Sequence, residues 1–121
     1  MKQKHILIIE DDKSILDAMQ MALGFAGYKV SLASSGEYAA DLMNGKAPLP
    51  DGILLDILLS GMDGRAICKE LKAHKKTKHL PIIMMSAHPK AESSVKEAGA
   101  DCFLPKPFPI DDLLDAVKNC I

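Results

Sequence analysis

The segment from residue 52 to residue 64, GILLDILLSGMDG, constrains the fold of this chain more than any other stretch. It begins with an apolar run without alternating polar residues, which is typical of a strand that helices cover on both faces. The run delivers one carboxylate, Asp56, to a loop that contains Gly61 and Gly64. Aspartate is also a common turn residue, so this segment alone leaves Asp56 as either a turn former or a functional group.

Four other segments have the pattern of strands. Residues 5–10 hold the apolar run ILII without alternation, and residues 28–33 alternate loosely, as an edge strand with one covered face does. Residues 81–86 form another apolar run that ends in a serine, and residues 101–105 form a short strand around a phenylalanine. Together with the segment at 52–64, these segments predict five strands.

Amphipathic segments separate these strands and predict five helices. The first helix is capped by Asp12 or Ser14 and ends at Gly27. The others are expected at 35–45, after Gly64, at 87–98 and from 109 onward. The helix at 87–98 has only one large apolar side chain, Val95, so we expect it to be among the least stable elements.

This alternation of strands and helices, without repeats or linkers, predicts the fold class. We expect a single α/β domain over residues 1–121, with a doubly wound, five-stranded parallel sheet and right-handed crossovers. A chain of 121 residues can bury a core without disulfides or a structural metal. Ligands of such sheets bind beyond the carboxyl ends of the strands.

Charge and cysteine content narrow the class of protein. A net charge of -1 supplies no field that would attract nucleic acid or membranes. The three cysteines, Cys68, Cys102 and Cys120, are widely spaced and form no metal or redox motif, so we expect them to be reduced in a cytosolic protein. No signal peptide precedes the first strand, and no apolar run approaches the roughly 20 residues that span a bilayer. We therefore expect a cytoplasmic protein that binds neither membranes nor nucleic acid.

One basic cluster follows Gly64, and it has no interleaved aromatic residue. We interpret it as a solvated helix face rather than a nucleic-acid site. Its members are Arg65, Lys69, Lys72, Lys75, Lys76 and Lys78.

Polar side chains fall at the ends of four predicted strands: Glu10 with Asp11, Asp56, Ser86 and Lys106. Three carboxylates in one crevice repel each other unless a cation compensates their charge. Oxygen ligands without histidine or cysteine suit Mg²⁺. A metal on one side of Asp56 and a lysine on the other would neutralise phosphoryl oxygens, which indicates phosphoryl transfer to an aspartate.

With these residues the chain resembles the receiver domain of two-component response regulators, a CheY-like family. The matching motifs are IIEDD at 8–12, LLDI at 54–57, GMDG at 61–64, MSA at 85–87 and FLPKPF at 103–108. They span nearly the whole chain. The resemblance implies a flavodoxin-like (βα)5 fold with the strand order 2-1-3-4-5.

The resemblance also implies roles for single residues. Asp56 would accept a phosphoryl group from a histidine kinase, a phosphotransfer protein or a small acyl phosphate. Asp11 would bind Mg²⁺ directly and Glu10 through water, and Asp56 with the carbonyl group of Leu58 would complete the protein ligands. Ser86 would then hydrogen-bond the phosphoryl group.

Other implied roles concern Lys106 and the surface that signals to partners. Lys106 would pair with the phosphoryl group, and the Lys106-Pro107 peptide bond is a candidate for the cis form. Phe103 is either the family's switch aromatic, which turns inward when Ser86 moves, or an ordinary core residue. The signalling face toward a downstream protein would comprise the helix at 87–98, the strand at 101–105 and the helix from 109 onward.

Two positions depart from the family pattern or lie near its site. Ser60 stands where many members have proline, so we expect the loop after Asp56 to be more mobile. His88, close to the expected pocket mouth, is either an influence on hydrolysis of the acyl phosphate or an ordinary loop histidine.

Other functions fit the residues less well. A pseudo-receiver that docks partners without phosphorylation needs none of the acidic, hydroxyl and lysine residues just named. A phosphatase of the haloacid dehalogenase type carries a D-x-D pair after strand one, where this chain has adjacent acids. A flavin-binding domain shares the sheet topology, but an acidic loop opposes a flavin phosphate. We expect a switch that catalyses only its own phosphorylation and dephosphorylation and is not an enzyme in the usual sense.

The chain length bears on the whole protein. Ending at Ile121 leaves no room for an output domain, so we expect a stand-alone receiver or a piece of a longer regulator or hybrid kinase. We expect a monomer or a phosphorylation-dependent dimer.

Overall fold

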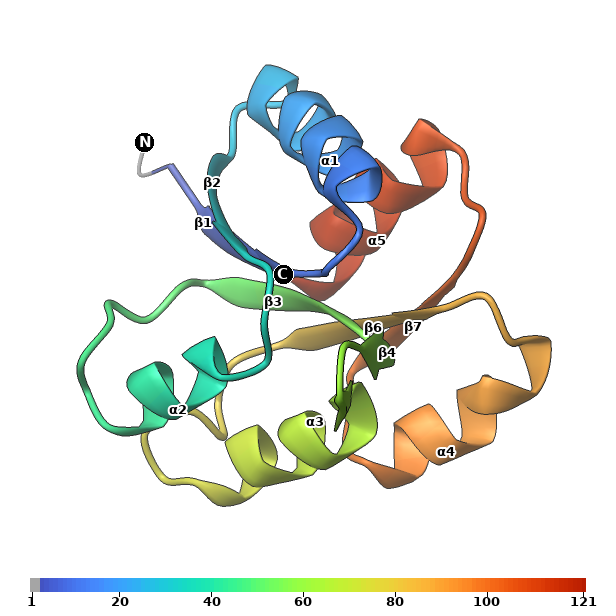
Figure 1. Cartoon of the computed structure of the whole chain (residues 1–121). Coiled ribbons are helices and arrows are strands. Elements are labelled where there is room, and N and C mark those ends of the chain that lie inside the picture. The colour runs from blue at the N-terminus through green and yellow to red at the C-terminus, as the bar shows by residue number, and fades with distance from the viewer. Residues whose placement is uncertain (1–2) are drawn as a thin grey trace.

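The computed structural model describes residues 3–121, whose centre is a five-stranded parallel sheet (Figure 1). Its strands are β1 (His5–Ile9), β2 (Lys29–Ala33), β3 (Gly52–Asp56), β6 (Ile82–Ser86) and β7 (Cys102–Pro105). Their order across the sheet is β2-β1-β3-β6-β7, with every neighbouring pair parallel. This order confirms the predicted 2-1-3-4-5 topology. A short antiparallel hairpin, which was not predicted, follows β3 and consists of β4 (Leu58–Leu59) and β5 (Met62–Asp63).

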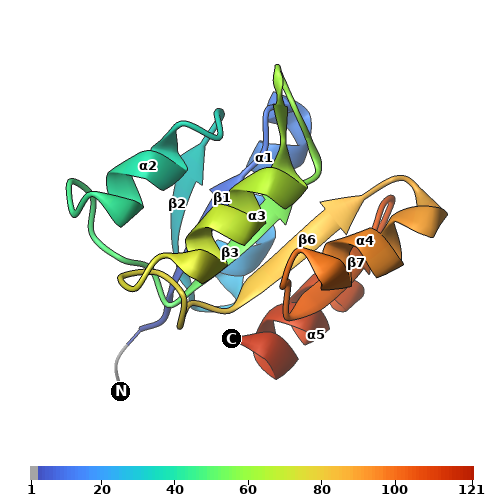
Figure 2. The same cartoon turned by 90° about the horizontal axis from the view of Figure 1, so that it is seen from below.

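Helices cover both faces of the sheet. One face carries α1 (Lys13–Phe25) and α5 (Ile110–Cys120), and the other carries α2 (Tyr38–Met43), α3 (Gly64–Ala73) and α4 (Glu92–Glu97) (Figure 1). Figure 2 shows α2, α3 and α4 side by side across the second face. Within residues 3–121, no helix has the length and apolar character needed to cross a membrane.

The alternating faces of β1 explain why its sequence shows no polar alternation. Ile6 and Ile8 join the core beneath α1 and α5, whereas Leu7 and Ile9 join the core beneath α2, α3 and α4. All four side chains are at most 1% exposed. Because both faces of the strand are covered, every position must be apolar.

The ends of two helices test expectations from the sequence: Asp12 or Ser14 as the cap of α1, and residue 87 as the start of α4. Asp12 caps α1, since its carboxylate accepts hydrogen bonds from the backbone N–H groups of Ser14 and Ile15 at 2.9 and 3.2 Å.

The helix expected at 87–98 begins only at Glu92, after a 3₁₀ turn at Pro89–Ala91. The residue before proline, His88, is extended (φ -95°, ψ 112°), which keeps residues 87 and 88 out of the helix.

The expectation that all three cysteines are reduced is wrong for one pair. Cys102 on β7 and Cys120 on α5 form a disulfide with their Cα atoms 6.6 Å apart, within the usual range. Cys68 is free and buried, and burial raises the pKa of its thiol to about 11. The pair is 18 residues apart in the chain, and only the packing of α5 against β7 brings it together.

This pairing predicts a thiol count. The protein unfolded without reductant should react with one equivalent of iodoacetamide, and after reduction it should react with three, as read by intact mass. The Cys120→Ser variant is the control, because its two remaining thiols should react whether or not reductant is added. Alkylation of three thiols before reduction would contradict the disulfide.

Candidate functional site

The candidate site lies where the carboxyl ends of the parallel strands meet. Glu10 follows β1, Asp56 ends β3, Ser86 ends β6 and Lys106 follows β7. The chain leaves β1 toward β2 on one side and enters β3 on the other, so the order of the strands reverses between β1 and β3. A crevice forms at such a reversal, and it is where ligands of this class of sheet bind.

An acidic cluster of Glu10, Asp11 and Asp56 occupies this edge. One carboxylate oxygen from each residue lies within 4.8 Å of the others. Glu10 and Asp56 are only 1% and 5% exposed, whereas Asp11 is open to solvent. The donors are all oxygen atoms with one side open to water, and such a set fits Mg²⁺, which keeps several of its waters.

Lys106 is the cation that the protein itself supplies to this cluster. Its Nζ donates a hydrogen bond to Glu10 Oε1 and lies 3.0 Å from Asp56 Oδ1. Its backbone N–H donates to the carbonyl oxygen of Ser86 at 2.8 Å, which fixes the start of the loop after β7. The Lys106-Pro107 bond is cis, as expected.

The pKa values of Glu10 and Lys106 are shifted by their surroundings. Burial raises the pKa of Glu10, and the nearby Asp56 charge adds to this, while the hydrogen bond from Lys106 opposes it. Burial alone would lower the pKa of Lys106, but its hydrogen bonds to Glu10 and Asp56 outweigh burial and raise that pKa. Lys106 is therefore charged at neutral pH and faces more negative charge than it can neutralise, which favours a further cation.

The loop after Asp56 is held by close packing at Gly64. A Cβ atom at this position would lie 2.1 Å from the carbonyl oxygen of Asp56, so only glycine fits. The Gly64 N–H also donates to the carbonyl oxygen of Ile57 at 2.7 Å. Leu58 is 78% exposed at the site's edge, and the role expected for its carbonyl group stays a prediction.

Ser86 lies at the end of β6, whereas Phe103 lies within β7. Ser86 is buried, and its hydroxyl oxygen accepts a hydrogen bond from the His88 N–H at 3.0 Å. Among the described residues, no hydrogen bond joins the Ser86 hydroxyl group to Asp56. Phe103 is half-buried beside Met84 on β6 and packs against the core beneath α2, α3 and α4.

Ser60 is a site residue whose contact the sequence did not indicate. Its backbone N–H and its hydroxyl group both donate hydrogen bonds to Asp11 Oδ2, at 2.9 and 2.8 Å. The hydrogen bonds from Ser60 are the main reason that the pKa of Asp11 is lowered. Ser60 was predicted only as a departure that loosens the loop, because a contact across 49 residues has no local signal.

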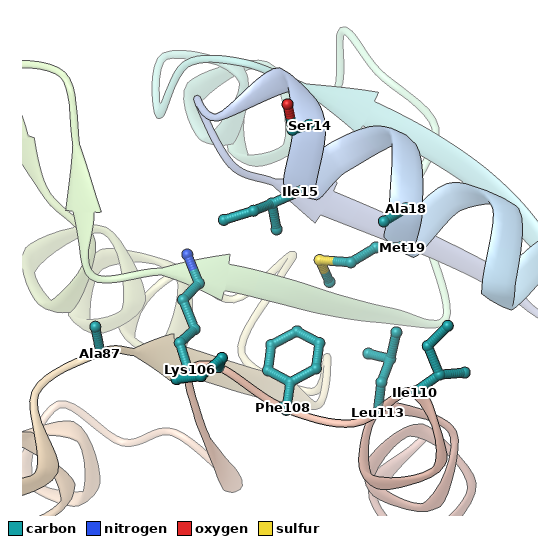
Figure 3. A pocket seen from close by; sticks show the side chains of 10 residues that line it. Ser14, Ile15, Ala18, Met19, Ala87, Lys106, Phe108, Ile110 and Leu113 are labelled. Carbon is teal, nitrogen blue, oxygen red and sulfur yellow. The ribbon is translucent and has the colours of Figure 1, made fainter.

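An apolar groove of about 500 Å³ opens beside the site and was also not predicted (Figure 3). Figure 3 shows Lys106 at one end of this groove, with Phe108 and Met19 facing each other next to it. One wall belongs to α1 and the other to the start of α5 and the loop before it. The groove therefore adjoins the same lysine that contacts Asp56.

Comparison with known proteins agrees with this architecture. Residues 6–118 match the family model described as response regulator receiver domain, and the chain belongs to this family. Response regulator MprA of Mycolicibacterium vanbaalenii is 35% identical over 115 residues, covering 93% of this chain and 48% of the relative. The chain thus spans about half the length of the curated relatives that it matches. Receiver domains are signalling proteins rather than enzymes with an external substrate.

Solved structures show the same fold. The chemotaxis response regulator CheY4 of Vibrio cholerae superposes with a TM-score of 0.89 at 26% identity, covering 99% of this chain and 100% of that one. The phosphorylated cyanobacterial phytochrome response regulator RcpA gives a TM-score of 0.82 at 25% identity, covering 98% and 91%.

Replacing Lys106 by methionine tests the charge balance of the buried cluster. The variant leaves Glu10 and Asp56 without their cation, so we expect the free energy of unfolding to fall by about 3 kcal/mol at pH 8 in EDTA. The loss should be smaller at pH 5. The Glu10 pKa is raised in the folded state, so Glu10 binds a proton there and loses its unpaired negative charge. Stability of the variant therefore falls as the pH rises.

Urea denaturation at pH 5 and pH 8 measures this difference. Lys13→Met is the matched control, because the Lys13 side chain is 87% exposed and should change stability little at either pH. An equal loss for Lys106→Met at both pH values would contradict the proposed charge balance.

Proposed function

We propose that this chain is a phosphorylation-activated signalling switch that accepts a phosphoryl group on Asp56. The observation that carries the proposal is the contact of Lys106 Nζ with the buried Asp56 carboxylate, 3.0 Å away, beside Glu10 and Asp11. Pure docking of a partner needs neither a buried acid nor a lysine opposite it. A pseudo-receiver is therefore the weaker alternative.

The chemistry is a displacement at phosphorus. A carboxylate oxygen of Asp56 forms the new O–P bond, and the bond from phosphorus to the donor breaks, with its electron pair leaving on the histidine nitrogen or on the acyl oxygen. The product is an acyl phosphate on Asp56. Lys106 neutralises a phosphoryl oxygen at this step, a role that its raised pKa supports by keeping it charged.

Glu10, Asp11 and Asp56, together with the carbonyl group of Leu58, are the residues that would hold Mg²⁺. When bound, Mg²⁺ supplies positive charge to the incoming phosphoryl oxygens. The three carboxylates give it an oxygen-only site whose exposed member, Asp11, faces solvent.

The donor is a histidine kinase or a phosphotransfer protein, with small acyl phosphates as substitutes. Relatives described as response regulators, one of them in a phosphorylated form, support this choice. The apolar groove beside Lys106 offers a protein donor a surface next to the acceptor carboxylate. The net charge of -1 gives the domain no basic field for nucleic acid or anionic membranes, and we propose that it binds neither.

The output surface is the face formed by α4, β7 and α5. Ser86 would turn its hydroxyl group toward the phosphoryl group, and the half-buried Phe103 would move inward with it. Ser86 ends the strand that leads into α4, and α4 has six residues with only Val95 buried. An element so weakly anchored can shift with Ser86, and this supports a two-state surface that a downstream protein reads.

Labelling with acetyl phosphate tests the phosphoryl acceptor. Incubation with acetyl phosphate and Mg²⁺ should add one phosphoryl group by intact mass, and hydroxylamine should remove it because acyl phosphates are labile to this nucleophile. Asp56→Asn should abolish the adduct, and Asp11→Ala should weaken the dependence on Mg²⁺. Asp51→Asn, an exposed aspartate at the opposite end of β3, is the control and should label normally. An adduct that survives Asp56→Asn would refute the assignment.

A further inference from the structure

Ser60 connects the two loops that carry the acidic cluster. It lies in the turn between β4 and β5, in the loop that follows Asp56. Asp11 lies in the loop after β1, and Ser60 reaches it with two donors, the backbone N–H at 2.9 Å and the hydroxyl group at 2.8 Å. Both donors bond the same carboxylate oxygen, Oδ2, so the side chain of Asp11 is tied to the opposite wall of the site.

This contact matters because Asp11 is the exposed member of the cluster. An exposed aspartate samples several side-chain rotamers, and ordering it costs conformational entropy when a ligand binds. Ser60 orders the carboxylate in advance. A carboxylate has a second oxygen with free lone pairs, so Asp11 can bind a cation through Oδ1 while Ser60 keeps Oδ2.

The residue type at position 60 is what makes the contact available. A proline at this place would have no N–H group and no hydroxyl group, so it could make neither hydrogen bond. The serine therefore gives this chain a supporting contact for its metal ligand that a proline would remove. Hydrogen-bonded partners of metal ligands fix ligand orientation and raise metal affinity.

We propose that Ser60 is a positioning residue that holds Asp11 in the orientation that binds Mg²⁺. The proposal rests on the proposed function, because it takes the acidic cluster to be a Mg²⁺ site. It reverses the sequence-based expectation for position 60. The serine ties the loop to Asp11 rather than loosening it.

Isothermal titration of the unphosphorylated protein with MgCl₂ tests this inference without any reaction. Ser60→Ala loses the hydroxyl donor and should bind Mg²⁺ about ten-fold more weakly, at the lower end of the loss typical for such supporting contacts. Ser60→Pro loses both donors and should bind more weakly still. Ser60→Thr keeps both donors and should retain wild-type affinity, a rescue that a merely structural role of the loop would not produce.

Controls separate this inference from the function on which it rests. Ser93→Ala removes an exposed serine from α4 and should leave Mg²⁺ affinity unchanged, and thermal unfolding in EDTA shows whether each variant folds. Equal affinity of wild type and Ser60→Ala, or equal weakening by Ser60→Ala and Ser60→Thr, would overturn the role of Ser60 alone. A wild-type protein that binds no Mg²⁺ would overturn both this role and the metal site.

Discussion

The ion pairs that Lys106 makes with Glu10 and Asp56 are the interaction on which the rest of the site depends. Burying a charge is costly unless a partner compensates it, and here one cation serves two carboxylates that are at most 5% exposed. The site therefore keeps an excess of negative charge, which a divalent cation would balance. A phosphoryl group on Asp56 would add charge at the same point and draw Lys106 toward it, so the proposed chemistry and the proposed switch would share one electrostatic cause.

The sheet holds the carboxylates of the site rigidly, and the weakly anchored helix α4 beside it can transmit a change. Strands β1, β3 and β6 are buried, so any displacement of the elements that hold the carboxylates of Glu10 and Asp56 would disrupt core packing. In contrast, α4 has one fully buried side chain and follows Ser86 after a short connection. A rigid site beside a lightly anchored helix suits a protein whose surface must respond to one covalent event.

The sequence predicted what depends on local pattern, and it failed where distant segments meet. The five strands and the carboxyl-edge residues followed from local pattern, as with β3 and Asp56, whereas the strand order was implied by the resemblance to receiver domains. The disulfide between Cys102 and Cys120, the tie from Ser60 to Asp11 and the groove beside Lys106 depend on packing that no single segment encodes. The late start of α4 could have been predicted, since His88 precedes a proline.

The central claim is that charge added at Asp56 changes the face formed by α4, β7 and α5. Amide ¹H–¹⁵N NMR spectra recorded before and after acetyl phosphate and Mg²⁺ are added test it most directly, with Asp56→Asn as the control for Mg²⁺ alone. We expect the amide signals of α4 and of Phe103 on β7 to shift in the wild-type protein and to stay in place in the variant. Shifts confined to the residues beside Asp56, or equal shifts in Asp56→Asn, would contradict the account.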